Sequence, residues 1–194
     1  NPLLENLQQA GWIDHWFFIR YQDPDIHIRL RLHITSPLHL VNILTSVQKA
    51  LQPWLKQGFV WNLQTDTYSR EIERYGSRTI ELSEQLFWVD SQLVVQLLYM
   101  LEDFGEEQSL KWLSGMMYAD NLLEQFQYPI SKRIDLFDLL KSNYLRNLGA
   151  DTPIVTKQFN RRYGKHRSTI EEYLYTQDYQ DEVKSAIQNL LHQY

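Results

Sequence analysis

The stretch HIRLRLHI, residues 27–34, puts a side chain that can carry positive charge at every second position. Successive side chains of a β-strand point to opposite faces, so a strand here would gather these groups on one face. That face would carry His27, Arg29, Arg31 and His33. Neighbouring arginines on it lie about 6.6 Å apart and can converge on one carboxylate or phosphate. The alternative is an ordinary solvated sheet face.

The two histidines of this face lie about 20 Å apart, which excludes a zinc ion bound by this pair alone. The chain contains no nucleotide-binding glycine loop, no serine-hydrolase elbow and no H-E-x-x-H motif. It also contains no cysteine, which excludes thiolate metal sites and cysteine nucleophiles. We therefore expect neither a metal nor a cofactor.

A second basic segment is YSREIERYGS, residues 68–77. Arg70 and Arg74 fall on one face of a strand and, at positions i and i+4, also on one face of a helix. Because Glu71 and Glu73 stand beside them, a surface ion-pair network is the alternative interpretation.

A third segment, KQFNRRYGKHR, residues 157–167, mixes basic and aromatic side chains as RNA-binding surfaces do. Its Asn160 and Gly164 indicate a solvated loop instead, and the formal net charge of -5 argues against a dedicated nucleic-acid binder. No apolar run approaches the roughly 20 residues that cross a bilayer. We expect neither direct nucleic-acid binding nor a membrane span.

The elements that would position these groups predict an α+β fold. A small, mainly antiparallel sheet in the N-terminal part would pack with a predominantly helical C-terminal half. WFFIRY, residues 16–21, reads as a strand buried on both faces, and the turn signal QDPD joins it to residues 27–34 as a hairpin. The apolar side chains of residues 27–34 would then face the core. Residues 59–68 have strand-like composition, and helical signals begin near residue 81.

The length of 194 residues predicts one domain, residues 1–194, able to bury about 70% of the surface that its unfolded form exposes. The opening NPLLENLQQAGW reads as the last turns of a helix that ends at Gly11. We therefore expect this domain to be part of a larger chain.

Two motifs in order carry a resemblance to a known family. WFFIRYQDPDIHIRLRL, residues 16–32, and EIERYGSRTIELSEQLFWVDS, residues 71–91, resemble the C-terminal domain of class I lantibiotic dehydratases. They also resemble the related thiopeptide-type bacteriocin biosynthesis domains. The resemblance implies glutamate elimination, a lyase reaction. A separate domain esterifies Ser or Thr of a precursor peptide with glutamate from glutamyl-tRNA, and this domain expels the glutamate to leave dehydroalanine or dehydrobutyrine.

The resemblance also assigns catalytic residues. Arg31 matches the second arginine of the family's H-[IL]-R-x-R strand, and Arg74 matches the arginine of its E-x-E-R-Y-G-G motif. His192 falls where the family has a histidine linked to elimination, and an imidazole can carry a proton near neutral pH. Arginine suits a developing enolate oxygen or a carboxylate because it stays charged and presents a planar fork.

Substrate binding is expected at three positions of the same motifs. Arg29 is the candidate for the substrate carboxylate, with His27 and Tyr75 beside the catalytic arginines in sequence. The family's Gly-Gly becomes Gly76 and Ser77 here, which puts in doubt a backbone conformation that glycine adopts easily.

Two other functions stay open. One is the thiopeptide reaction, in which this fold joins two dehydroalanines in a formal [4+2] cycloaddition to make a pyridine ring. The other is a domain without catalytic activity that binds the precursor peptide by strand addition and charge contacts. The expected partners are the precursor peptide and a glutamylation domain on the same or a separate chain, in the bacterial cytoplasm. A homodimer is also left open.

Overall fold

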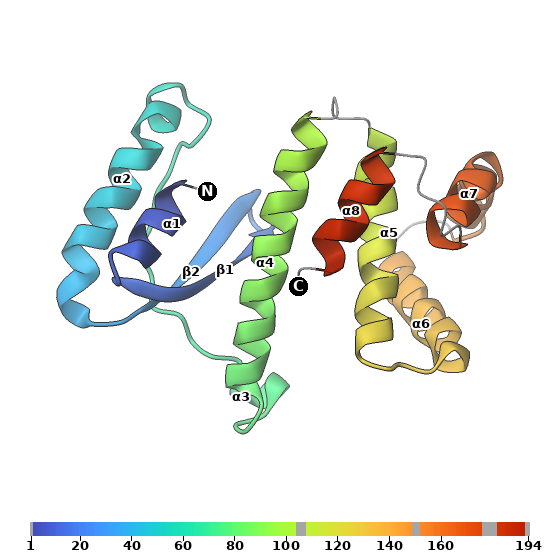
Figure 1. Cartoon of the computed structure of the whole chain (residues 1–194), viewed down its shortest axis with the longest axis horizontal. Helices are drawn as coiled ribbons and strands as arrows, with labels where there is room; N and C mark the ends of the chain where they lie inside the picture. Colours follow the sequence, from blue (N-terminus) through green and yellow to red (C-terminus); the bar gives the residue numbers. More distant parts are fainter. Residues whose placement is uncertain (1, 104–107, 149–151, 176–181, 193–194) are drawn as a thin grey trace. The chain divides into compact units, whose positions relative to one another are not determined.

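The computed structural model describes residues 2–103, 108–148, 152–175 and 182–192 (Figure 1). Its contacts divide the chain into two compact units, Asn1–Gln96 and Leu97–Tyr194, which are described separately. A two-stranded antiparallel sheet near the N-terminus and a large helical content confirm the predicted α+β class.

The first unit consists of a hairpin and the helices around it. In chain order its elements are α1 (Pro2–Gln9), β1 (Ile13–Tyr21), β2 (His27–Ile34), the 3-10 helix η1 (Pro37–His39), α2 (Leu40–Lys56), α3 (Ile72–Tyr75) and α4 (Ile80–Asp103), which ends in the second unit. Ser36 begins the helical region after β2, because its hydroxyl accepts a hydrogen bond from the backbone of Leu38 and Pro37 occupies a first-turn position.

The core of the first unit lies under one face of the hairpin. Helices α1 and α2 lie on that side in Figure 1. The most buried apolar residues there are Leu4, Leu7, Ile13, Trp16 and Ile43. Burial of each of these side chains contributes about 1.5–3 kcal/mol to the stability of the fold. The end of the hairpin away from its turn is therefore its most strongly stabilised part.

The predicted hairpin is confirmed, and the strand register places Arg31 opposite Phe17 and Arg29 opposite Ile19. The expectation that the whole apolar face of β2 is core is wrong. Ile28 is 66% exposed and Leu30 is 37% exposed, because the buried cluster gathers at the end of the hairpin away from its turn.

Other local predictions need correction. β1 is not buried on both faces throughout, since only Trp16 and Phe17 are buried within residues 16–21. Residues 61–71 have no regular secondary structure, so the strand expected at 59–68 is absent from this described segment. An irregular segment there carries Tyr68 and Arg70 to α4, where both make contacts described below.

The second unit contains α5 (Gln108–Gln125), α6 (Ile130–Leu148), α7 (Thr152–Tyr175) and α8 (Glu182–His192). Helix α5 is in contact with both α7 and α8, and buried Leu113 and Met117 lie on it. None of the described helices combines the length and apolar character that crossing a membrane requires.

The basic segment 157–167 is helical, not the loop that its asparagine and glycine indicated. It forms the middle of α7, where Gly164 has open space around it. His166 contacts Trp112 of α5 edge-on, at 5.5 Å between ring centroids, and Arg167 pairs with Glu171 one turn later. Contact with α5 and pairing along the helix outweigh the helix cost of one glycine, about 1 kcal/mol.

Candidate functional site

A small pocket lies against the hairpin face that turns away from α1 and α2. Its volume is about 70 Å³, room for a few waters or for one carboxylate or ester group. It is lined by side chains from both strands, from the irregular segment and from α4. These residues are His15, Phe17, Arg31, Leu32, His33, Tyr68 and Glu84.

Arg31 brings the positive charge to this pocket. Its guanidinium carbon lies 4.9 Å from the centre of the Tyr68 ring, a cation–π arrangement. The Nε of Arg31 is buried and has no hydrogen-bond partner within the described part of the chain. A buried donor without an acceptor costs about 1–3 kcal/mol, so an oxygen atom entering the pocket would be bound favourably at this point.

The part of the pocket lined by α4 contains a buried carboxylate, Glu84, which a pair of hydrogen bonds holds in place. Glu84 of α4 is only 6% exposed and accepts two hydrogen bonds from the Arg70 fork, at 2.9 Å from Nε and 2.7 Å from a terminal nitrogen. Burial raises the pKa of the Tyr68 phenol, and the negative charge of Glu84 raises it further. Tyr68 therefore stays a neutral hydroxyl near neutral pH, and its ring packs edge-on against Phe17, 5.7 Å away.

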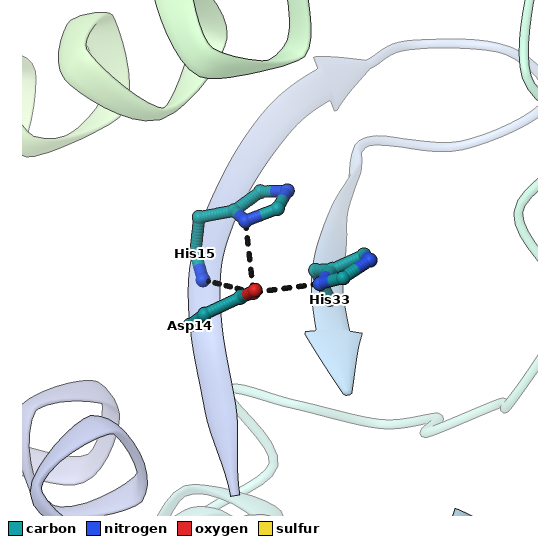
Figure 2. Close-up of side chains that lie close together, drawn as sticks. All are labelled: Asp14, His15 and His33. Atoms are coloured by element: carbon teal, nitrogen blue, oxygen red, sulfur yellow. Dashed lines mark hydrogen bonds and ion pairs between the residues drawn. The ribbon is translucent and has the colours of Figure 1, made fainter. Parts of the chain in front are cut away.

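Figure 2 shows a cluster of three polar side chains, Asp14, His15 and His33, of which the two histidines line the pocket. The register shifts between Ile13 and Trp16, so two residues of β1, Asp14 and His15, lie opposite one residue of β2, His33. The rings of His15 and His33 stack with 4.4 Å between centroids and 11° between planes.

One oxygen of the Asp14 carboxylate joins the members of this cluster. Asp14 Oδ1 lies 2.8 Å from Nδ1 of His15, 2.7 Å from Nδ1 of His33 and 2.7 Å from the backbone nitrogen of His15. Burial alone would raise the pKa of Asp14. The hydrogen bonds from His33 and from the His15 backbone, with the charges of both imidazoles, lower it below its usual value instead.

The pocket contains one of the predicted site residues, Arg31. Arg29 and His27 lie farther along β2 toward its turn, in a group of their own. Arg29 lies 3.9 Å from the centre of the Tyr21 ring and donates to Nε2 of His27 at 3.1 Å, and His27 stacks on Tyr21. Arg29 and Arg31 thus share a strand face, as predicted, but each rests on a different tyrosine.

Arg74 and Tyr75 belong to α3, the short helix that precedes α4. Arg74 is 71% exposed, is weakly paired with Glu71 at 3.4 Å and lies 5.4 Å from the Tyr75 ring centre. Tyr75 contacts Phe87 edge-on at 5.3 Å, and Phe87 in turn contacts Phe17 at 5.4 Å. Aromatic rings therefore connect α3 to the pocket, although Arg74 does not line it.

Two further predictions concern Ser77 and His192. Gly76 has φ +79°, a conformation that suits glycine, whereas Ser77 has no positive φ, so replacing the family's second glycine is compatible with this turn. His192 is the last residue of α8, and its side chain lies outside the described part of the chain.

Sequence reasoning missed Asp14, His15, Tyr68 and Glu84. The residues DH directly before WFFIRY, at 14 and 15, were the available signal for the first two. Only a bulge places both opposite His33, and alternation along a regular strand does not predict a bulge. Tyr68 and Glu84 come together across an irregular segment, for which the sequence offers no periodic pattern.

Comparisons with known proteins give consistent results. Residues 1–194 match the family model "Lantibiotic biosynthesis dehydratase C-term". The chain is 35% identical over 136 residues to the subtilin biosynthesis protein SpaB of Bacillus subtilis, covering 68% of this chain. It is 29% identical over 131 residues to the nisin biosynthesis protein NisB of Lactococcus lactis subsp. lactis, covering 67% of this chain. The matched parts are 12% and 13% of those proteins' lengths.

Two crystal structures share the fold at 20% sequence identity. TsrL matches with a TM-score of 0.54 over 100% of this chain and 60% of its own. The tRNA-dependent lantibiotic dehydratase MibB from Microbispora sp. 107891 matches with a TM-score of 0.52 over 98% of this chain and 23% of its own.

Proposed function

We propose that this chain, which belongs to the family of lantibiotic biosynthesis dehydratase C-terminal domains, eliminates glutamate from glutamylated Ser or Thr of a precursor peptide. The products would be dehydroalanine or dehydrobutyrine in the peptide and free glutamate. The observation that carries this proposal is Arg31, whose buried Nε–H has no acceptor among the described residues and lies at a pocket the size of an ester group.

The reaction defines what the pocket must do. A base removes the proton on Cα of the modified residue, and the electron pair then forms the Cα=Cβ double bond. The Cβ–O bond of the ester breaks, and glutamate leaves as a carboxylate. Negative charge develops on the peptide carbonyl oxygen as the proton departs, so a donor fixed at that oxygen accelerates the reaction.

Arg31 suits this oxygen because it forms no ion pair with a carboxylate of the described residues, and Glu84 of the same pocket is itself paired with Arg70. Arg31 rests on the Tyr68 ring, which attracts the cation but provides no counter-charge. Tyr68 in turn is positioned beside Glu84, which the Arg70 fork holds in place. The electrostatic attraction of Arg31 therefore remains available to the substrate.

The other family positions receive roles that rest on the resemblance and on their surroundings. Arg74 is exposed at 71%, and only a 3.4 Å pair with Glu71 would have to yield for it to reach an anionic group. Arg29 with His27 would hold the carboxylate of the departing glutamyl group, and Tyr75 would support Arg74. His192 remains the candidate for a second proton-transfer group.

The proposal places this chain downstream of a glutamylation domain, on the same or a separate chain, in the bacterial cytoplasm. The name of the structural neighbour MibB, a tRNA-dependent lantibiotic dehydratase, agrees with a tRNA-dependent earlier step. The proposal requires no second copy of this chain.

The test is mass spectrometry of a synthetic Ser-glutamylated peptide incubated with the purified protein. We expect loss of the whole glutamate and formation of dehydroalanine. Arg31→Ala should slow this reaction by about 10²–10³-fold, the usual effect of removing one oxyanion donor. The control is Arg167→Ala, an exposed arginine of α7 paired with Glu171, which should leave the rate unchanged.

Two results would count against elimination. An unchanged ester in a wild-type protein that still binds the peptide would favour the binding-only function. Conversion of a peptide with two dehydroalanines into a pyridine, with the glutamyl ester left intact, would favour the cycloaddition.

A further inference from the structure

We propose that Asp14, His15 and His33 are the proton-accepting group of this pocket, with Nε2 of His15 taking the Cα proton. The inference rests on the proposed function, because it names the base for that elimination. It rests on geometry as well, since both imidazoles line the pocket that holds Arg31.

The Asp14 carboxylate sets the tautomer of both rings, through a hydrogen bond with His33 and a close contact with His15. An ionised carboxylate only accepts hydrogen bonds, and the pKa of Asp14 is lowered, so Asp14 is ionised near neutral pH. Nδ1 of His33 makes a hydrogen bond to its Oδ1 and therefore carries a proton. Nδ1 of His15 lies 2.8 Å from the same oxygen as a close ion-pair contact; a lone pair there would face the carboxylate, so we assign its proton to Nδ1 as well. The lone pair of each neutral ring is therefore on Nε2.

These Nε2 atoms are free to accept a proton. In Figure 2 they point away from Asp14, and neither has a partner among the described residues. His15 is the better acceptor for substrate because its side chain is 22% exposed and contacts the Trp88 ring. His33 is 59% exposed, which suits it to exchange protons with solvent.

The charges around the cluster favour one added proton. A proton on either ring balances the Asp14 carboxylate, whereas two protons would put two positive rings 4.4 Å apart. Arg31 adds a positive charge from β2 and Glu84 a negative one from α4, while Tyr68 is neutral. The cluster can therefore accept one proton in the reaction and release it through His33.

In the proposed step, Nε2 of His15 takes the Cα proton, and Arg31 stabilises the negative charge on the carbonyl oxygen. The Cα=Cβ bond then forms and glutamate leaves as its carboxylate, so charge and atoms balance. The added proton on His15 returns to solvent, and no oxidant, reductant or metal takes part.

The same three residues could be considered as metal ligands, since their donor atoms all lie within 4.8 Å of one another. The geometry favours protons. A metal must lie in the plane of each imidazole that binds it, at about 2.0–2.1 Å, and two rings stacked at 11° do not share such a point. The distances of 2.7 and 2.8 Å to Asp14 are hydrogen-bond distances, shorter than the roughly 3.3 Å between neighbouring ligands of a tetrahedral zinc.

The first experiment compares His15→Gln with His39→Gln in the elimination assay. His39 is the matched control, a half-buried histidine that stacks on Trp12 outside the pocket. We expect His15→Gln to lower the elimination rate by about 10²–10⁴-fold, the usual contribution of a general base, and His39→Gln to leave it unchanged. A wild-type rate in His15→Gln would overturn the inference while leaving the elimination itself established.

A second substrate separates proton removal from bond cleavage. It is a peptide in which an amide to diaminopropionate replaces the ester, so that the bond at Cβ does not break. In D₂O the wild-type protein should exchange the Cα proton for deuterium, and His15→Gln should lose this exchange. Exchange that persists in His15→Gln would identify another base.

Asp14 and His33 are positioning residues in this proposal, and a split of kcat from KM with rescue by a conservative variant tests them. Asp14→Asn removes the carboxylate that orients both rings, so it should lower kcat and Cα exchange with KM unchanged, and Asp14→Glu should restore part of the rate. A merely structural role would give no such split and no rescue by Glu, and that result would overturn the assignment.

Two measurements do not depend on elimination. ¹⁵N NMR of the wild-type imidazoles should show Nδ1–H tautomers for His15 and His33. Finding a lone pair on both Nδ1 atoms would refute the arrangement whether or not the protein eliminates glutamate. Titration with Zn²⁺ should show no tight site. Tight binding that His15→Gln and Asp14→Asn both abolish would identify a metal centre instead.

Discussion

The bracing carboxylate Glu84 offers a sharp test of how the pocket is held. In Glu84→Gln the amide oxygen can still accept one hydrogen bond from Arg70, but the amide nitrogen faces the other guanidinium N–H as a second donor. One of the two bonds, at 2.9 and 2.7 Å, is therefore lost at a side chain that is 9% exposed. A hydrogen bond to a charged group is worth about 1.5–3 kcal/mol.

Because Arg70 keeps 38% of its side chain exposed, water compensates part of the loss, and we expect a destabilisation of about 2 kcal/mol. For a chain of this length the melting temperature should fall by about 4–8 °C. Elimination should also slow, since Tyr68 loses the neighbour that positions it under Arg31. Thermal unfolding followed by circular dichroism and the elimination assay would measure both effects.

The matched control is Glu81→Gln. Glu81 lies 3.9 Å from the same Arg70, but its side chain is 80% exposed, so its removal should change stability by less than about 0.5 kcal/mol. If the two variants melt at the same temperature, burial of the Glu84 carboxylate does not brace the pocket, and the reasoning is wrong.

Two further predictions concern the turn before α4 and the pH dependence of stability. Gly76→Ala should lower the free energy of unfolding by about 1–3 kcal/mol, because φ is +79° and the new Cβ would meet Thr79 Oγ1 at 3.0 Å. The control is Gly58→Ala, which has a similar φ of +77° but open space around the new Cβ and should cost less. Equal urea midpoints for the two variants would contradict this prediction. The folded-state pKa of Asp14 is lowered from 3.8, so its contribution to stability is complete above that pH and is lost as pH falls through the lower folded value. Urea unfolding at pH 5 and pH 3 should therefore show a larger loss for wild type than for Asp14→Asn, and equal losses would refute the linkage.

Part of the fold and of the site could be predicted from short-range pattern alone. Alternation in residues 27–34 correctly placed Arg31 and Arg29 on one face of a hairpin strand. Alternation does not reveal how far the core extends, which is why the exposure of Ile28 was not foreseen. The helix at 157–167 was missed because its glycine and asparagine were read as loop signals, while the contact with Trp112 that supports it is distant in sequence.

The sequence also does not predict which group each arginine side chain contacts, because these contacts join residues that are distant in sequence. The four arginines of these motifs look alike in the sequence, yet Arg70 is paired with the buried Glu84, whereas Arg31 and Arg29 rest on aromatic rings. Arg74 has both kinds of contact, a 3.4 Å pair with Glu71 and the Tyr75 ring. A carboxylate partner neutralises the charge, and a ring leaves it available to an incoming anion.

The contact partners of Arg70 and Arg31 suit the two arginines to different roles: Arg70 stabilises the pocket, and Arg31 is available to a ligand. Arg70 is paired with Glu84, a buried carboxylate that lines the cavity, while the Nε–H of Arg31 at this cavity has no partner within the described segments. The bulge brings the imidazoles of His15 and His33 to the same hairpin face as Arg31, so a donor for negative charge and an acceptor for a proton line one space of about 70 Å³. An elimination needs those two groups on opposite sides of one Cα–H and its carbonyl.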